Sequence, residues 1–98
     1  MPRQAVHPGE ILREDYMIPF GISGNALARA LDVPPNRITQ IIAEENPRTV
    51  TADTALRLAR YFGTSPDLWV NLQRSYDLAM AEAEHGAHIR DVVRPRAA

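Results

Sequence analysis

The sequence predicts an all-α fold of five helices, and two observations point to it. No stretch of the 98 residues shows the sustained alternation of apolar and polar side chains that is typical of half-buried strands. Residues that start and end helices recur along the chain instead, namely serine and threonine caps, first-turn prolines, and glycines that follow apolar runs. A chain of this length is expected to form one small domain.

The first three predicted helices are short. The first is expected to begin near Pro8 and to end by Gly21, with its apolar side chains turned inward. Ser23 is placed to cap the second helix through its hydroxyl group. Pro35 suits the first position of the third helix, because the N–H that proline lacks would have no helical partner there.

The fourth and fifth helices have equally clear starts. Thr51 is expected to cap the fourth helix, and Ser65, followed by proline and aspartate, predicts the start of the fifth. An acid in a first turn also interacts favourably with the helix dipole. The fifth helix is expected to end near Ala83, which gives one domain over residues 1–86 and a short flexible tail over residues 87–98.

Residues 24–42 carry the most informative pattern in the chain. Two short segments, each with one apolar face, meet at a break around Asp32 and Val33. Ala28 lies mid-segment on the inward face, where a small side chain lets two steeply crossed helices approach closely. Val33 is an apolar residue in the turn that would fill the space between them. This pattern is typical of the helix-turn-helix of DNA-binding proteins, whose second helix lies in the major groove.

The third helix supports this interpretation through its outward face. Arginine can contact guanine, asparagine and glutamine can contact adenine, and threonine can contact a thymine methyl group. A surface helix without DNA would also carry polar residues, so the prediction rests on their combination with the apolar pattern. Arg37 and Gln40 are expected to read most of the bases. The candidate DNA-binding residues are Ser23, Asn25, Pro35, Asn36, Arg37, Thr39, Gln40 and Arg48.

The fifth helix carries an apolar stripe that is wide for one small core. Trp69, Leu72 and Tyr76 form its centre. We expect part of this stripe to contact a second copy of the chain, which makes these three residues the candidate dimer interface. A homodimer would also place two recognition helices about 34 Å apart, the spacing of successive major grooves. The alternative is that the whole stripe packs on the first and fourth helices.

Composition narrows the class of protein further. The net charge is −1 and the pI about 6.3, less basic than is usual for a DNA-binding domain, and every cation is an arginine. The chain has no cysteine, which excludes disulfides and zinc sites built on thiolates. It shows no apolar run of the kind that forms a signal peptide or a membrane span, so we expect a cytoplasmic protein.

No arrangement of side chains suggests a catalytic site or a metal site. The sequence shows no glycine-rich phosphate loop and no recognisable order of nucleophile, base and acid. His85 and His88 lie near acids, but Gly86 is expected to interrupt the helix between them and no third ligand is fixed nearby. We therefore expect a protein that is not an enzyme, binds no metal and needs no cofactor.

Five sequence blocks within residues 7–78, namely 7–14, 25–31, 33–38, 51–66 and 69–73, follow one another in a characteristic order. The order of these blocks resembles the HigA-type antitoxins of the Cro and lambda-repressor-like helix-turn-helix family. The resemblance implies a five-helix lambda-repressor-like domain with its second and third helices as the helix-turn-helix. It also implies a homodimeric repressor that binds double-stranded operator DNA of its own operon and neutralises a ribonuclease-type toxin encoded beside it.

The chain departs from the family pattern at two places near the expected DNA. Gly24 stands where the family commonly has glutamine, and Glu44 and Glu45 stand where it commonly has a basic turn. Each departure removes a contact to the DNA backbone, which contributes much of the affinity of such proteins. The resemblance therefore implies the class of protein, but the contacts of this chain with DNA are expected to differ from those of its relatives.

The expected toxin surface is the first helix with the N-terminal arm, since only short segments at the chain ends are predicted to be loose. Glu10, Glu14 and Asp15 would present acid to a basic ribonuclease, although they could equally serve only to solvate the helix. Two other functions stay open. One is a protein-interaction module with little or no DNA binding, which Glu44 and Glu45 favour slightly. The other is a stand-alone transcriptional regulator without a toxin.

Overall fold

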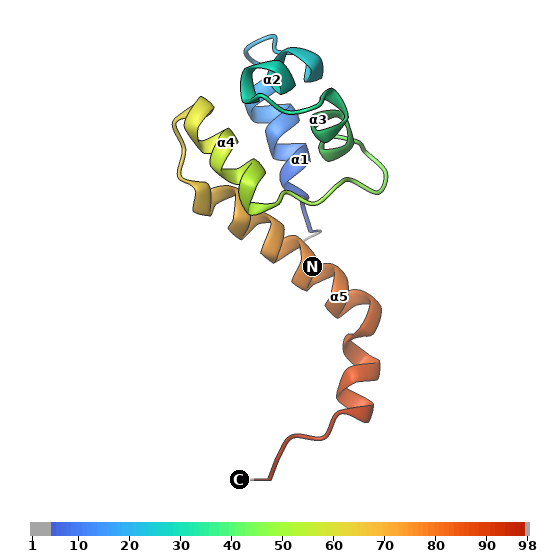
Figure 1. The fold of residues 1–98 in the computed structure, drawn as a ribbon. Helices are drawn as coiled ribbons and strands as arrows, with labels where there is room; N and C mark the ends of the chain where they lie inside the picture. Colours follow the sequence, from blue (N-terminus) through green and yellow to red (C-terminus); the bar gives the residue numbers. More distant parts are fainter. Residues whose placement is uncertain (1–4, 98) are drawn as a thin grey trace.

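The computed structural model describes residues 5–97, and Figure 1 shows the arrangement of their helices. No strand occurs among these residues, so the all-α prediction is confirmed. The first helix begins as an α-helix and continues without a break as a π-helical segment, so the fold has five helical rods. The elements are α1 (Pro8–Ile11), η1 (Leu12–Met17), α2 (Gly24–Leu31), α3 (Pro35–Ile41), α4 (Ala52–Phe62) and α5 (Pro66–Val92).

The predicted helix starts are confirmed in the structure. The side-chain oxygens of Ser23, Thr51 and Ser65 accept the backbone N–H groups of residues 26, 54 and 68 at 3.1, 3.4 and 3.2 Å. Each bond satisfies a donor that the first turn of a helix would otherwise leave without a partner. At α1 the cap is a histidine, because Nδ1 of His7 accepts the N–H of Gly9 at 2.9 Å.

The core lies where α1 to α4 pack together and onto the N-terminal half of α5. Trp69 of α5 is fully buried in this core, and its ring lies 5.2 Å from that of Tyr16. Gln73 of α5 accepts the N–H of Val50 at 2.8 Å and so fixes the segment that leads into α4. The C-terminal half of α5 projects away from the body (Figure 1).

The expectation that the fifth helix ends near Ala83 is wrong, because α5 continues through Gly86 to Val92. Gly86 lies inside the helix with the carboxylate of Glu82 packed against it, and Glu82 forms an ion pair with Arg90 two turns further on. Because both side chains of the pair are exposed, it adds little stability, and the glycine is tolerated within a long helix. Residues 87–92 are therefore helical, and the flexibility of the tail stays a prediction.

Candidate nucleic-acid interface

The predicted break between the second and third helices is present, and its geometry explains the sequence. Asp32 adopts a left-handed conformation with φ 58° and ψ 49°, which aspartate tolerates better than most residues. The N–H of Val33 then donates to the carbonyl of Ala28 at 3.0 Å and closes the end of α2. Ala28 is fully buried, as the close approach of α2 and α3 requires. These helices therefore form a helix-turn-helix.

The position of α3 is fixed by its buried face and by the first helix. Ile38 and Ile41 are fully buried. The guanidinium of Arg13 donates to the carbonyl of Ile42 at 2.5 Å, at the end of α3. A Cβ at Gly9 would overlap the carbonyl oxygen of Ile41 and lie 2.8 Å from its carbonyl carbon. Gly9 and Arg13 thus position the recognition helix, a role that residue patterns alone did not reveal.

Three of the predicted base-reading side chains, those of Asn36, Thr39 and Gln40, are exposed on the face of α3 opposite the isoleucines. Gln40 is also joined to Arg48, whose backbone N–H donates to the Gln40 carbonyl at 2.9 Å and whose Nη1 donates to Oε1 at 3.2 Å. This contact uses the amide oxygen of Gln40 and leaves its amide nitrogen as the group that could donate to a base. The structure therefore brings Gln40 and Arg48 together.

The remaining predicted DNA-binding residues lie at the start of α2 and of α3. The hydroxyl oxygen of Ser23 accepts a hydrogen bond that caps α2, while Asn25 and Pro35 are exposed. Gly24 lies where a Cβ would be 3.3 Å from the Thr39 methyl group, so the start of α2 passes close to the recognition helix. This contact gives the glycine a packing role at the position where the family commonly has glutamine.

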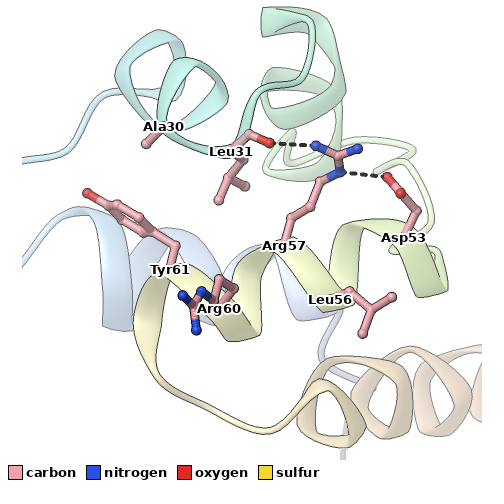
Figure 2. Close-up of a pocket in the computed structure, with 7 residues that line it drawn as sticks. All are labelled: Ala30, Leu31, Asp53, Leu56, Arg57, Arg60 and Tyr61. Atoms are coloured by element: carbon pink, nitrogen blue, oxygen red, sulfur yellow. Dashed lines mark hydrogen bonds and ion pairs between the residues drawn. The ribbon is translucent and has the colours of Figure 1, made fainter.

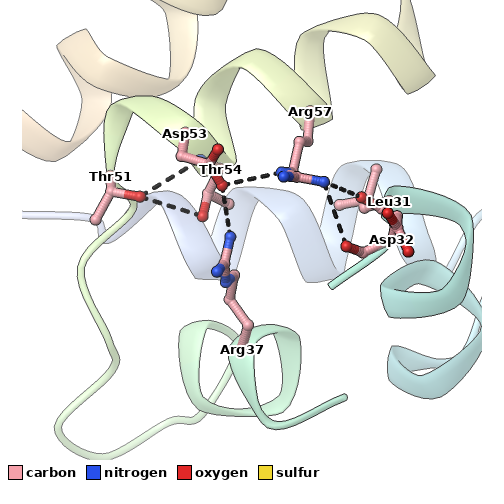
Figure 3. Close-up of polar contacts among 7 residues, drawn as sticks. All are labelled: Leu31, Asp32, Arg37, Thr51, Asp53, Thr54 and Arg57. Carbon is pink, nitrogen blue, oxygen red and sulfur yellow. Dashed lines mark hydrogen bonds and ion pairs between the residues drawn. The ribbon is translucent and has the colours of Figure 1, made fainter. Parts of the chain in front are cut away.

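Among the predicted base-reading residues, Arg37 is the one that forms an ion pair within the described part of the chain. Its Nη1 donates to Oδ2 of Asp53 at 2.6 Å, and the same oxygen accepts Nε of Arg57 at 2.9 Å (Figure 3). Arg57 also donates to the carbonyls of Leu31 and Asp32 at 2.8 and 3.3 Å. The hydrogen bonds from Arg57 and Arg37 lower the pKa of Asp53. Sequence reasoning missed Asp53, because its contact joins two helices across sixteen positions and depends on how they pack.

An open groove of about 540 Å³ lies beside this network, between α2 and α4 (Figure 2). It is lined by Leu31 of α2 and by Leu56, Asp53 and Arg57 of α4. Its lining is completed by Ala30, Arg60 and Tyr61. The groove is broad and mixed in character, so it marks an accessible surface next to the helix-turn-helix and not an enclosed ligand site.

The proposed dimer residues need one correction. Trp69 is fully buried within a single chain, and its Nε1 donates to Thr64 at 2.9 Å, so its side chain does not face a second subunit. The prediction was wrong for Trp69 because it was based on the width of the apolar stripe on the fifth helix, and the indole instead fills the core against the first helix. Leu72 and Tyr76 are only partly buried, and Tyr76 packs edge-on against His7 with ring centroids 4.9 Å apart.

The candidate toxin-binding acids lie on the first helical rod. Glu10, Glu14 and Asp15 are all exposed, and Glu14 pairs with Arg13 at 3.3 Å. Over residues 5–97 no three acidic or histidine side chains gather as metal ligands would. In the same part of the chain, none of the helices combines the length and the apolar character needed to span a bilayer.

The class of protein is a helix-turn-helix DNA-binding protein. Three features define it: the fixed position of α3, its exposed amide and hydroxyl side chains, and the turn at Asp32. The family model described as Helix-turn-helix matches residues 14–69. The antitoxin HigA-1 of Vibrio cholerae serotype O1 is 37% identical over 76 residues, which are 78% of this chain and 70% of that protein. This chain belongs to the HigA-type antitoxins of the helix-turn-helix family.

Other relatives extend the similarity to nearly the whole chain. Virulence-associated protein I of Dichelobacter nodosus is 58% identical over 80 residues, which are 82% of this chain and 72% of that protein. The structure of Pseudomonas aeruginosa antitoxin HigA with the higBA promoter has a TM-score of 0.88 and 44% identity, covering 95% of this chain and 99% of that one. The structure of antitoxin GraA in complex with its operator has a TM-score of 0.90 and 42% identity, covering 100% of this chain and 97% of that one.

Proposed function

We propose that this chain is the DNA-binding antitoxin of a toxin–antitoxin pair, which represses its own operon and neutralises a ribonuclease toxin encoded beside it. The observation that carries the proposal is the exposed polar face of α3 on a helix-turn-helix. It is supported by solved relatives that contain promoter or operator DNA and match this chain over almost its full length. The proposed mode of action is binding without catalysis, in the cytoplasm where the operon lies.

In the proposed complex α3 enters the major groove of operator DNA. Asn36, Thr39 and Gln40 then face the base edges, where amide and hydroxyl groups can read donor and acceptor patterns. Asn25 and Arg48 flank the helix and are assigned to backbone phosphates, as is Ser23 through the start of α2. Two copies joined through α5 would read two half-sites about 34 Å apart.

The experiment that tests this function is a mobility-shift titration on DNA from upstream of the chain's own gene. We expect a specific shift that is stronger than the shift on random DNA of equal length. The product of the adjacent gene, added to the same reaction, is expected to bind the shifted complex or alter it. Absence of sequence preference in the wild-type chain would contradict the repressor function.

A matched substitution tests the recognition helix itself. Arg37→Ala should cost about 1–3 kcal/mol on the specific site and relax selectivity at one base pair, because arginine is the side chain best suited to read guanine. Arg74→Ala, an exposed arginine of α5, is the control. Equal losses on specific and random DNA would assign Arg37 to phosphate binding. Unchanged binding to both would contradict the docking of α3.

A second candidate function is a protein-interaction module that binds a toxin or another partner but little DNA. The observation that favours it is the pair of exposed acids, Glu44 and Glu45, in the loop directly after α3. Acids at this place repel the DNA backbone. A chain that binds the adjacent gene product and shows no shift on upstream DNA would support this function. A shift without any binding of that product would support a stand-alone regulator.

A further inference from the structure

We propose that Asp53 sets the DNA specificity of the recognition helix by holding the guanidinium of Arg37. The proposal rests on the proposed DNA-binding function and deepens it. Asp53 lies on α4, outside the helix-turn-helix, and we assign it no contact with DNA. It is a positioning residue that acts through Arg37.

The contact joins the recognition helix to the start of α4. A single carboxylate oxygen of Asp53 accepts Arg37 at 2.6 Å and Arg57 at 2.9 Å (Figure 3). The side chains of Arg37, Asp53 and Arg57 are 27%, 55% and 37% exposed, so the network lies at the surface and water reaches it. The guanidinium of Arg37 is therefore accessible to DNA while it is paired, unlike a guanidinium in the core.

The carboxylate is held in place independently of Arg37. Arg57 donates to the backbone carbonyls of Leu31 and Asp32, so it is fixed at the end of α2, where the helix dipole attracts a cation. Asp53 itself stands in the first turn of α4, where the dipole attracts an acid. Asp53 thus offers Arg37 a fixed acceptor that two helices, α2 and α4, position.

This fixed acceptor has different consequences for random DNA and for a specific site. A flexible, unpaired arginine binds any phosphate, which adds affinity without sequence information. Beside Asp53 the charge of Arg37 is offset in part, because the same carboxylate also pairs with Arg57, and an approaching phosphate meets a carboxylate. The guanidinium has five N–H donors, and the ion pair uses one nitrogen, so donors remain for a base. An arginine that is already held loses less rotamer entropy when it binds that base.

The test measures affinity of the whole chain by fluorescence anisotropy over a salt series, on upstream DNA and on a random duplex of equal length. Asp53→Asn keeps the size of the side chain and removes its charge. We expect tighter binding to random DNA and a salt slope steeper by about 1. The ratio of specific to random affinity should fall about tenfold, within the range for one base-reading arginine.

Asp67→Asn is the matched control, because Asp67 occupies the same first-turn position on α5, after a capping serine and a proline. It makes the same change in net charge away from α3 and should leave the ratio unchanged. Asp53→Asn should also have no effect on the ratio when Arg37 is already alanine. That loss of effect separates positioning of Arg37 from a general gain of positive charge.

Three outcomes would overturn the proposal. The first is an unchanged ratio for Asp53→Asn, and the second is the same change in the wild-type and Arg37→Ala backgrounds. In both cases a wild-type chain that still prefers upstream DNA leaves the proposed function standing. The third is a wild-type chain with no preference at all, which overturns the proposed function and this inference together. Asp53→Ser, which also suits a first turn, replaces Asp53→Asn if thermal melts show that the asparagine variant is unfolded.

Discussion

At the scale of single residues, His7 shows how one side chain begins the fold. Its Nδ1 accepts the N–H of Gly9, which requires the unprotonated nitrogen, and its ring packs on Tyr76. Burial lowers the pKa of His7, and the negative charge of Asp77 opposes this only in part. The buried histidine is therefore a neutral helix cap, in agreement with the expectation that the first helix starts here.

This cap predicts a pH dependence of stability. The pKa of His7 is lower in the folded chain than its unfolded value of about 6.5, so the unfolded state takes up the proton first. The stabilisation is complete above pH 6.5 and falls as the pH drops below it, until the folded form also protonates. Melting temperatures measured from pH 7.5 to pH 5 should show this decrease.

His7→Asn is the variant that checks the assignment, because asparagine can still cap a helix through its side-chain oxygen but does not titrate. We expect it to flatten the pH dependence in this range. His88→Asn, at an exposed position of α5, is the control and should leave the dependence as it is. A decrease of the same size in His7→Asn would show that another group is responsible.

Residue chemistry that acts over a few positions could be predicted from the sequence, and contacts between helices could not. Ser23 and Thr51 were predicted as caps because the partner of each cap lies three residues away. The ion pair of Arg37 with Asp53 spans sixteen positions and depends on how α4 crosses α3. Its discovery therefore required the packing of the helices, as did the burial of Trp69.

At the scale of elements, the first helix determines where the recognition helix lies. Gly9 is in direct contact with the backbone at the end of α3, and Arg13 donates to the last turn of the same helix. The sequence shows that α3 exists and which face it buries. It does not show that α1 contacts the C-terminal end of α3. Gly9 makes this contact possible because it has no side chain, and a glycine alone does not indicate which segment lies against it.

Substitution of this glycine tests the arrangement. Gly9→Ala should destabilise the fold by about 3 kcal/mol or more, since the added methyl group meets a carbonyl oxygen of the backbone and no flexible side chain can move aside. Chemical denaturation measures the loss. Gly21→Ala is the control: its φ of +63° costs roughly 1–2 kcal/mol, but its added methyl group has open space. A smaller loss at Gly9 than at Gly21 would contradict the close contact.

The length of α5 shows a different limit of sequence reasoning at this scale. A glycine costs a helix about 1 kcal/mol, which made Gly86 a reasonable place to expect its end. The helix continues because the sequence around Gly86 is otherwise rich in helix-forming residues. The exposed ion pair of Glu82 with Arg90 adds little to this. Whether a helix passes a glycine depends on neighbours in both directions.

At the scale of the whole molecule, α5 is the element best placed to join two chains. Its N-terminal half completes the core, while its C-terminal half projects from the body (Figure 1). Leu78 and Met80 of α5 are exposed, and Leu72 and Tyr76 remain partly exposed. A second chain packed along this surface would bury apolar area that a single chain leaves in contact with water.

The proposed homodimer predicts a mass twice the chain mass of 10.9 kDa at micromolar concentration, measured by analytical ultracentrifugation. Tyr76→Ala should weaken the dimer, because a large aromatic side chain at the centre of an interface contributes strongly to binding. Tyr61→Ala, a partly exposed tyrosine of α4, is the control. Trp69→Ala cannot serve here, since loss of a buried indole costs about 3–5 kcal/mol and would unfold the chain first. A folded wild-type monomer would contradict the proposal.

The proposed toxin surface makes a second prediction for the whole molecule. Glu10, Glu14 and Asp15 are exposed on a helix that the core holds rigidly, so a basic toxin could dock there without ordering a tail. Glu14→Arg combined with Asp15→Arg should weaken binding of the adjacent gene product at least about tenfold, since like charges across an interface cost several kcal/mol. Calorimetry measures the affinity, and a ribonuclease assay measures the neutralisation.

Two control variants distinguish the acids of the first helix from the C-terminal half of α5 as the toxin surface. Glu84→Arg combined with Asp91→Arg makes the same change in net charge on that exposed half of α5 and should leave toxin binding intact. Deletion of residues 87–98 should do the same, because a segment of this length is too short to wrap a globular partner in the way that disordered antitoxin tails do. If that deletion alone abolishes neutralisation, the toxin binds the end of α5, and the acids of the first helix serve only to solvate it.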